Sequence, residues 1–185
     1  MVVGVELVKR EKCLKTGQTF LRTNKIKKEL YPLLADSVKK FVPQEYVVYA
    51  SKNDAAVTNK NPPNELDSLN SNQEEADTKI FVHLQHGLKH DKIRKAAILA
   101  NDIDVVVVGI GLFENLRRDG LIELWISYGK GDKKRWVPIH LLYVALGPQK
   151  SRGLLFFHAF SGCDSCSGWK RKGKKSFYAT WSVYP

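Results

Sequence analysis

Cysteine is scarce in this sequence, which contains only Cys13, Cys163 and Cys166. Three thiols are an odd number and too few to staple a chain of 185 residues, which excludes a disulfide scaffold and predicts a reducing, intracellular setting, the nucleus included. Cys163 and Cys166 form a single C-x-x-C, with His158 upstream of them. Because zinc needs four ligands and no fourth is evident, we predict that this pair holds no zinc.

Long hydrophobic runs are also missing. The longest, Val105–Phe113, is about half of the roughly 20 residues that a membrane-spanning helix needs. At the N-terminus, Glu6 interrupts the apolar residues after Met1 before they could form the core of a signal peptide. The sequence therefore predicts a soluble protein with no place in a membrane.

Acidic residues are few, with 19 Asp and Glu against 30 Lys and Arg and a formal net charge of +11. Such an excess of positive charge suits a polyanionic partner, either a nucleic acid or an acidic membrane surface. The charge alone does not choose between them.

The chain is expected to fold as one compact α/β unit, because its length requires no second domain. Residues 1–28 are rich in Lys and Arg and predict a mobile or docking arm, or the remnant of an upstream part. Residues 51–72 are rich in Asn, Ser and Pro and predict a polar loop.

The spacing of apolar residues predicts the remaining elements. Helices are expected at about 30–41, from Ser71-Asn72 to His90, at 139–146 and at 174–181; strands are expected at 46–49, 96–99, 105–110, 121–127 and 135–137. The last two strands form a hairpin around Gly129-Lys130-Gly131-Asp132, and Gly147-Pro148 closes the third helix. The apolar segment Leu154–Phe160 is expected to be buried.

Three small groups of acids fall at the ends of these elements. They are Glu74-Glu75-x-Asp77, Asp102-x-Asp104 and Asp164. Mg²⁺ and Mn²⁺ prefer oxygen ligands, and a few convergent carboxylates are enough to hold them. Each group also has an ordinary structural explanation: the first complements a helix N-terminus, Asp102 caps a turn, and Asp164 occupies a Gly-Cys-Asp turn.

Taken in order, these acids resemble the motifs of PIN-like nucleases of the flap-endonuclease and XPG type, whose counterparts are Glu-Ala-Glu, Asp-x-Asp and Gly-Cys-Asp. The phrases EEADT, DIDVVV, FHAFSGCD and KGKK look closer still to uncharacterised animal proteins with this domain, some of them possibly derived from mobile elements. The resemblance implies a three-layer α/β domain at 29–185 with a central, mainly parallel sheet. It also implies structure-selective hydrolysis of phosphodiesters in DNA or RNA, with DNA the expected partner.

The resemblance further implies a site with two Mg²⁺ or Mn²⁺ ions, whose ligands are Glu75, Asp77, Asp102, Asp104 and Asp164. Asp77, Asp104 and Asp164 are the expected catalytic residues, and we expect them to converge at the carboxyl edge of the sheet. In the family, the first metal-binding aspartates lie on earlier strands, whereas this chain has no Asp before Asp36. We therefore expect those strands to be missing here. The alternative function is a catalytically incomplete nucleic-acid-binding module.

A basic run near the C-terminus predicts contact with phosphates. It consists of Lys170, Arg171, Lys172, Lys174 and Lys175. Lysines beside the backbone amides of a helix start suit phosphate oxygens, although such a run is also common on a solvated face. The aromatic residues that follow, Phe177, Tyr178 and Trp181, are expected in the core. The histidines at 83, 86 and 90 are expected at or near the surface, outside the site.

Overall fold

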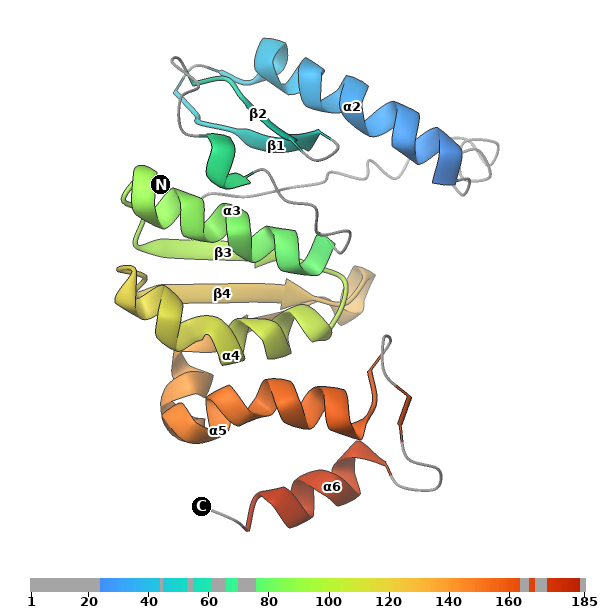
Figure 1. Ribbon diagram of the computed structural model, residues 1–185, viewed down its shortest axis with the longest axis vertical. Coiled ribbons are helices and arrows are strands. Elements are labelled where there is room, and N and C mark those ends of the chain that lie inside the picture. Colours follow the sequence, from blue (N-terminus) through green and yellow to red (C-terminus); the bar gives the residue numbers. More distant parts are fainter. Residues whose placement is uncertain are drawn as a thin grey trace. The chain divides into compact units, whose positions relative to one another are not determined.

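A computed structural model describes residues 24–43, 45–52, 55–60, 66–69, 76–163, 167–168 and 173–183. The chain divides into two compact units, with the boundary between Asp91 and Lys92 (Figure 1). One compact unit was expected from the length of the chain, and each of the two units is described separately below. Within the described ranges, no helix is both long and apolar enough to cross a membrane.

The first unit contains helix α2 (Asn24–Phe41), strands β1 (Tyr49–Lys52) and β2 (Ala55–Thr58), the 3-10 turn η1 (Leu66–Leu69) and helix α3 (Ala76–His90). Strands β1 and β2 form an antiparallel hairpin, and α2 packs along it (Figure 1). Ala35 is buried on the inner side of α2. Beside it, the Lys52 ammonium forms an ion pair with Asp36 at 2.7 Å.

Two boundaries in this unit differ from the sequence prediction. Helix α2 begins at Asn24, inside the expected basic arm, because the lysines there are good helix formers. Pro32 therefore lies within the helix and not in its first turn. The expected loop at 51–72 contains the end of β1, all of β2 and η1. These elements were not predicted because they are short and the segment around them is rich in polar residues.

Helix α3 ends at His90, as predicted. His86 is buried, contrary to the expectation of a surface residue, and its Nδ1 lies 2.7 Å from the Ser68 hydroxyl. The Tyr49 ring meets His86 edge-on, and the Tyr49 hydroxyl donates to Asp91 at 3.3 Å. Burial, together with the nearby His86 and Lys79, lowers the pKa of His83.

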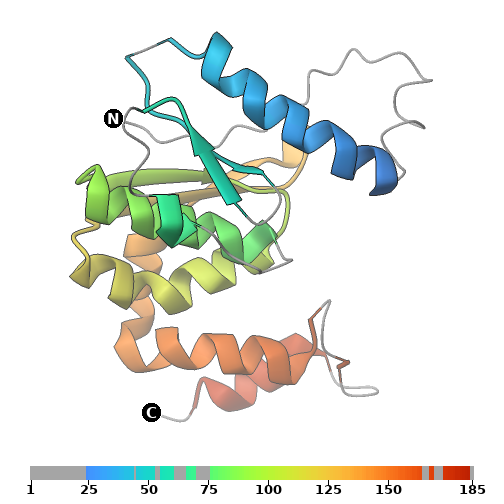
Figure 2. The same ribbon diagram turned by 45° about the horizontal axis from the view of Figure 1, so that its top comes forward.

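The second unit is built on a three-stranded sheet with the order β3-β4-β5. Strands β3 (Lys95–Leu99) and β4 (Glu123–Tyr128) are parallel, and β4 and β5 (Arg135–Pro138) form an antiparallel hairpin. The hairpin prediction is confirmed and so is the α/β class, but the sheet is mixed where a mainly parallel one was expected. Figure 2 shows the helix that follows β3 in the chain lying along this sheet.

Helix α4 (Asp104–Arg118) connects the two parallel strands. A strand was expected at 105–110, and this prediction is wrong. The β-branched run suggested a strand, but the apolar positions continue past it at helical spacing. The buried positions are Val105, Val106, Ile110, Phe113 and Leu116. The helix buries one face. It is also long enough for its backbone groups to form hydrogen bonds within the helix, which a run of only a few residues cannot do.

Helix α5 (Ile139–Ser161) follows β5 and bends at Gly147, whose φ is 78° and ψ 162°. The expected end of a helix at Gly147-Pro148 is therefore seen as a kink. Leu154–Phe160 is helical and not buried as expected: 73% of Phe156 and 44% of Phe160 are exposed. Helix α6 (Lys174–Trp181) has the predicted bounds.

Helices α4 and α5 approach closely at Gly111. A Cβ atom added there would lie 2.7 and 2.9 Å from the two Cδ atoms of Leu155 and also overlap its Cγ. The glycine therefore lets the two helices pack closely. Below them, the core of the sheet is formed by residues that are almost fully enclosed, namely Leu121, Leu124, Ile126, Ile139 and Val105.

A second contact between these helices joins Glu114 and Tyr143. The Tyr143 hydroxyl donates a short hydrogen bond to the Glu114 carboxylate. This hydrogen bond, with Arg117 and Arg118 nearby, lowers the pKa of Glu114, and it raises the pKa of Tyr143. Both shifts favour the same state, a charged carboxylate accepting from a neutral phenol.

We expect Gly111→Ala to destabilise the protein, although alanine is the better helix former. The gain in helix propensity is about 1 kcal/mol, and overpacking costs about 1–3 kcal/mol. Because the new Cβ overlaps three atoms of Leu155, we expect a net loss of up to about 2 kcal/mol in urea unfolding. In a Leu155→Ala background the obstruction is gone, so the same change should become stabilising. An unchanged sign in that background would contradict close packing at Gly111.

Stability should depend on Tyr143 through the ionisation of Glu114. A lowered pKa in the folded state contributes stability above the ordinary value of 4.5, and this contribution is lost as the pH falls through the lower folded value. Tyr143→Phe should therefore lower the urea midpoint at pH 7, and the difference from the unsubstituted protein should shrink towards pH 3. Tyr178→Phe, at an exposed position, is the control and should leave both midpoints unchanged. A Tyr143→Phe difference that is constant from pH 7 to pH 3 would count against this role for the contact.

Candidate metal and nucleic-acid site

Asp102 and Asp104 lie just beyond the carboxyl end of β3. The Ala100 N–H donates to the Ser127 carbonyl at 2.8 Å, which fixes the start of this loop against β4. Asp104 begins helix α4, and its N–H donates to the Asp102 Oδ1 atom at 3.2 Å. Asp102 therefore caps a turn, one of the explanations the sequence left open. The positive end of the α4 dipole also stabilises the Asp104 carboxylate.

His158 links this acidic turn to helices α5 and α6. Its Nε2 atom lies 3.1 Å from Asp104 Oδ1, with the two side chains 15% and 26% exposed. On the other side of the ring, the Lys174 ammonium lies 3.3 Å from Nδ1. Because the Lys174 ammonium can only donate, Nδ1 is the acceptor in that contact. The Nε2 atom lies close to the Asp104 carboxylate, although the geometry of this contact is not that of a hydrogen bond.

His158 was not among the predicted site residues. It was considered only as a possible zinc ligand beside Cys163, which is a free and half-buried thiol. The available signal was its place in FHAFSGCD, close before the Gly-Cys-Asp motif. Sequence spacing does not show that this histidine meets the start of α4.

Apart from Lys174 and Lys175, the other predicted site residues lie either in the first unit or outside the described residues. Asp77 lies in the first turn of α3, in the first unit. Glu75, Asp164, Cys166 and the basic residues 170–172 lie outside the described residues. The structure therefore brings together Asp102 and Asp104, and convergence of the full acidic set stays a prediction.

The donor chemistry of Asp102 and Asp104 fits a hard divalent cation, because both offer carboxylate oxygens. Across the described part of the chain, however, no three His, Cys, Asp or Glu side chains are grouped so as to hold a metal ion. The described residues thus supply part of a Mg²⁺ or Mn²⁺ ligand set. Further ligands would come from water and from residues outside the described ranges.

Basic residues flank this site from two elements. Lys174 and Lys175 are exposed in the first turn of α6. The β4–β5 turn, which follows the carboxyl end of β4, is a second exposed basic segment that the sequence analysis did not assign to binding. It contains Lys130, Lys133, Lys134 and Arg135. Since β3 and β4 are parallel, this turn follows the same sheet edge as Asp102 and Asp104.

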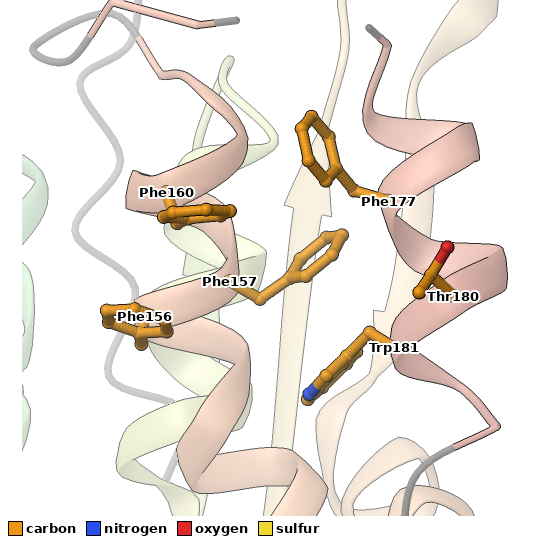
Figure 3. A pocket seen from close by; sticks show the side chains of 6 residues that line it. All are labelled: Phe156, Phe157, Phe160, Phe177, Thr180 and Trp181. Carbon is orange, nitrogen blue, oxygen red and sulfur yellow. The ribbon is translucent and has the colours of Figure 1, made fainter.

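The C-terminal aromatic residues are not in the core, contrary to expectation. No residue of α6 is buried. Phe177 and Trp181 face helix α5 and line a cleft with Phe156, Phe157, Phe160 and Thr180 (Figure 3). The aromatic side chains of α6 contact one helix, α5, instead of being enclosed in a core.

No family model matches the chain, and neither curated proteins nor solved structures give a match. The structure adds that the chain is α/β, with one parallel and one antiparallel strand pairing in the sheet of the second unit. The resemblance to flap-endonuclease domains thus depends on the motifs themselves, and the function is argued below from the site.

Proposed function

We propose that this chain is a divalent-metal-dependent nuclease domain of the PIN-like, flap-endonuclease type, which binds DNA and hydrolyses its phosphodiesters in a structure-selective way. The observation that carries the proposal is the contact series Asp104–His158–Lys174. A single imidazole ring separates a carboxylate suited to a metal from an ammonium suited to a phosphate. A phosphodiester held by Lys174 would therefore lie beside the acidic turn.

Each of these side chains has a distinct role in the proposed reaction. Lys174 and Lys175 bind the phosphate backbone, assisted by the N-terminal amides of α6. His158 keeps the Asp104 carboxylate in place and separates it from Lys174, which would otherwise neutralise it. Asp102 and Asp104, with Glu75, Asp77 and Asp164 by resemblance, would hold two Mg²⁺ or Mn²⁺ ions. When bound, these ions supply Lewis-acid activation of the phosphodiester and of the attacking water.

One observation favours the alternative, a nucleic-acid-binding module that does not cleave. Both described acids of the site already have protein partners, since Asp102 accepts the Asp104 N–H and Asp104 lies against His158. Such contacts are sufficient to explain the acids as structural. The two functions differ in their response to removal of one carboxylate.

Asp104→Asn should abolish cleavage and spare binding. The amide keeps the shape of the side chain and loses the charge that holds the ion. Cleavage of an end-labelled branched DNA with Mn²⁺ should fall by more than about 100-fold, a larger loss than that for a residue acting through a ligand. Binding, measured by fluorescence anisotropy with Ca²⁺ in place of Mn²⁺, should change little.

Asp119→Asn is the matched control, because it makes the same change of charge at the opposite end of α4. This variant should cleave DNA at the normal rate. A protein that cuts equally well with Asp104→Asn, or in excess chelator, would show that the acids are structural. A chain that binds DNA but never cuts with Mg²⁺ or Mn²⁺ would favour the non-cleaving module.

Lys174→Ala combined with Lys175→Ala should weaken binding to every DNA sequence alike. Removing two phosphate contacts should reduce the slope of log affinity against log salt concentration by about two. The control is Lys89→Ala, which removes one exposed lysine of α3 in the other unit. An unchanged salt slope in the double variant would exclude α6 as a phosphate-binding element.

A further inference from the structure

His158 has a buried ring nitrogen that forms no hydrogen bond among the described residues. This Nε2 atom lies 3.1 Å from the Asp104 Oδ1 atom, in a geometry that is not that of a hydrogen bond. Buried polar atoms in proteins nearly always have a partner, so each exception needs an explanation. The two atoms are an imidazole nitrogen and a carboxylate oxygen, and both kinds of atom bind metal ions.

The separation of these two atoms matches that of two neighbouring ligands of one metal ion. Bonds from nitrogen or oxygen to divalent ions such as Zn²⁺ and Mg²⁺ are about 2.0–2.2 Å long. Two such ligands at a right angle lie about 3.0 Å apart, and the two atoms here lie 3.1 Å apart. The Asp104 side chain is partly exposed, which leaves an approach from solvent. A cation bound by both atoms would satisfy the buried nitrogen.

Helix packing holds this pair of side chains in place. Asp104 begins α4, and His158 lies in the last turn of α5. The two helices meet again at Gly111 and Leu155, where even an added Cβ atom would overlap the leucine. The loop before α4 is fixed as well, because the Asp104 N–H donates to Asp102. Ligands that are already held together lose little freedom when an ion binds.

The donor atoms distinguish between the two ions of the proposed function. Carboxylate and water ligands suit Mg²⁺ and Mn²⁺ alike, whereas an imidazole nitrogen is a ligand for first-row transition ions. Mg²⁺ is bound in proteins mainly through oxygen, so a site with one nitrogen favours Mn²⁺. Among the described residues no third metal-binding side chain joins the pair. The remaining ligands would be water and residues outside the described ranges.

We infer that His158 Nε2 and Asp104 Oδ1 together bind one divalent cation, and that the nitrogen ligand makes this site selective for Mn²⁺ over Mg²⁺. The inference rests on the proposed function and deepens it. The acidic motifs alone assign no histidine to the metal. His158 is thus a ligand in its own right, in addition to separating Asp104 from Lys174.

Metal binding at Nε2 would also release Lys174. A neutral imidazole carries one proton, which must lie on Nδ1 when Nε2 binds an ion. Nδ1 then cannot accept from the Lys174 ammonium, so the 3.3 Å contact between them has to break. The freed ammonium is exposed and can bind a phosphate. The ion and the phosphate therefore favour each other's binding, and this coupling has the same size in both directions.

The direct test is pulsed electron paramagnetic resonance of Mn²⁺ bound to the complete chain. An imidazole nitrogen that is bound to Mn²⁺ modulates the spin echo, and a histidine outside the ligand set does not. The unsubstituted chain should show this nitrogen signal, and His158→Gln should lose it. His140→Gln is the matched control, since His140 lies in the same helix, and this variant should keep the signal.

A second readout is the competition of Mg²⁺ with bound Mn²⁺. His158→Gln should weaken Mn²⁺ binding by more than about 10-fold, the smallest loss expected even for a residue that acts through a ligand. It should weaken Mg²⁺ binding less, so the preference for Mn²⁺ should shrink. Asp104→Asn should weaken the binding of both ions, because the carboxylate is a ligand for either.

The coupling to Lys174 gives a result of opposite sign. Lys174→Ala should tighten Mn²⁺ binding, because it removes the donor that competes for the His158 ring. Lys175→Ala removes the same charge from the next position of α6 and is the control, which should tighten binding less. Mn²⁺ should in turn strengthen the binding of a short DNA strand to the unsubstituted chain more than to Lys174→Ala.

The outcomes separate this inference from the proposed function. Bound Mn²⁺ without a nitrogen signal in the unsubstituted chain would overturn ligation by His158, whether or not His158→Gln folds. An unchanged preference for Mn²⁺ in a folded His158→Gln protein would overturn it too. Both results would leave an ion bound by carboxylates, as the proposed function requires. Failure of the unsubstituted chain to bind either ion would overturn the inference and the proposed function together.

Discussion

The packing of α4 against α5 is the constraint on which the second unit depends. Three contacts join these helices, Asp104 with His158, Gly111 with Leu155, and Glu114 with Tyr143. From the first pair to the third, the residue numbers rise along α4 and fall along α5, so the two helices run in opposite directions. This arrangement brings the end of α5 to the start of α4. Every feature of the candidate site follows from that meeting.

The electrostatics of the site depend on an imidazole ring that lies between a carboxylate and an ammonium group. In direct contact, Asp104 and Lys174 would form an ordinary ion pair, and neither would be available to a ligand. The His158 ring keeps them apart while contacting both. A carboxylate and an ammonium held at this separation can serve two ligands of opposite sign, a cation and a phosphate. This combination suits the proposed function, in which a metal ion and a phosphate would bind side by side.

Much of the local structure could be predicted from the sequence, because it depends on nearby residues. The bounds of α6, the end of α3 and the β4–β5 hairpin all follow from spacing and turn residues. Helix α4 did not, because Val105–Val108 has the composition of a strand and only the longer pattern up to Leu116 distinguishes a helix. The division into two units also escaped prediction, since it depends on long-range packing.

The candidate site was predictable only in part, for the same reason. The order of acidic motifs identified Asp102 and Asp104, which adjoin a strand end as expected. The contacts of His158 with Asp104 and Lys174 join residues far apart in the sequence, and no local pattern encodes them. The exposure of Phe156 and Phe160 was missed because an apolar segment has the same composition in a core and on an exposed helix face.

The kink at Gly147 makes the direction of one half of a helix depend on a single residue. Its φ of 78° and ψ of 162° fall in a region open to glycine alone. The segment before the kink is anchored to the sheet, where His140 Nδ1 lies 3.2 Å from the Leu124 carbonyl. The segment after it carries His158 and the phenylalanines. A substitution at this joint would therefore redirect His158 and the phenylalanines as a group while leaving their side-chain chemistry intact, so that one residue sets the orientation of the whole second half of the helix.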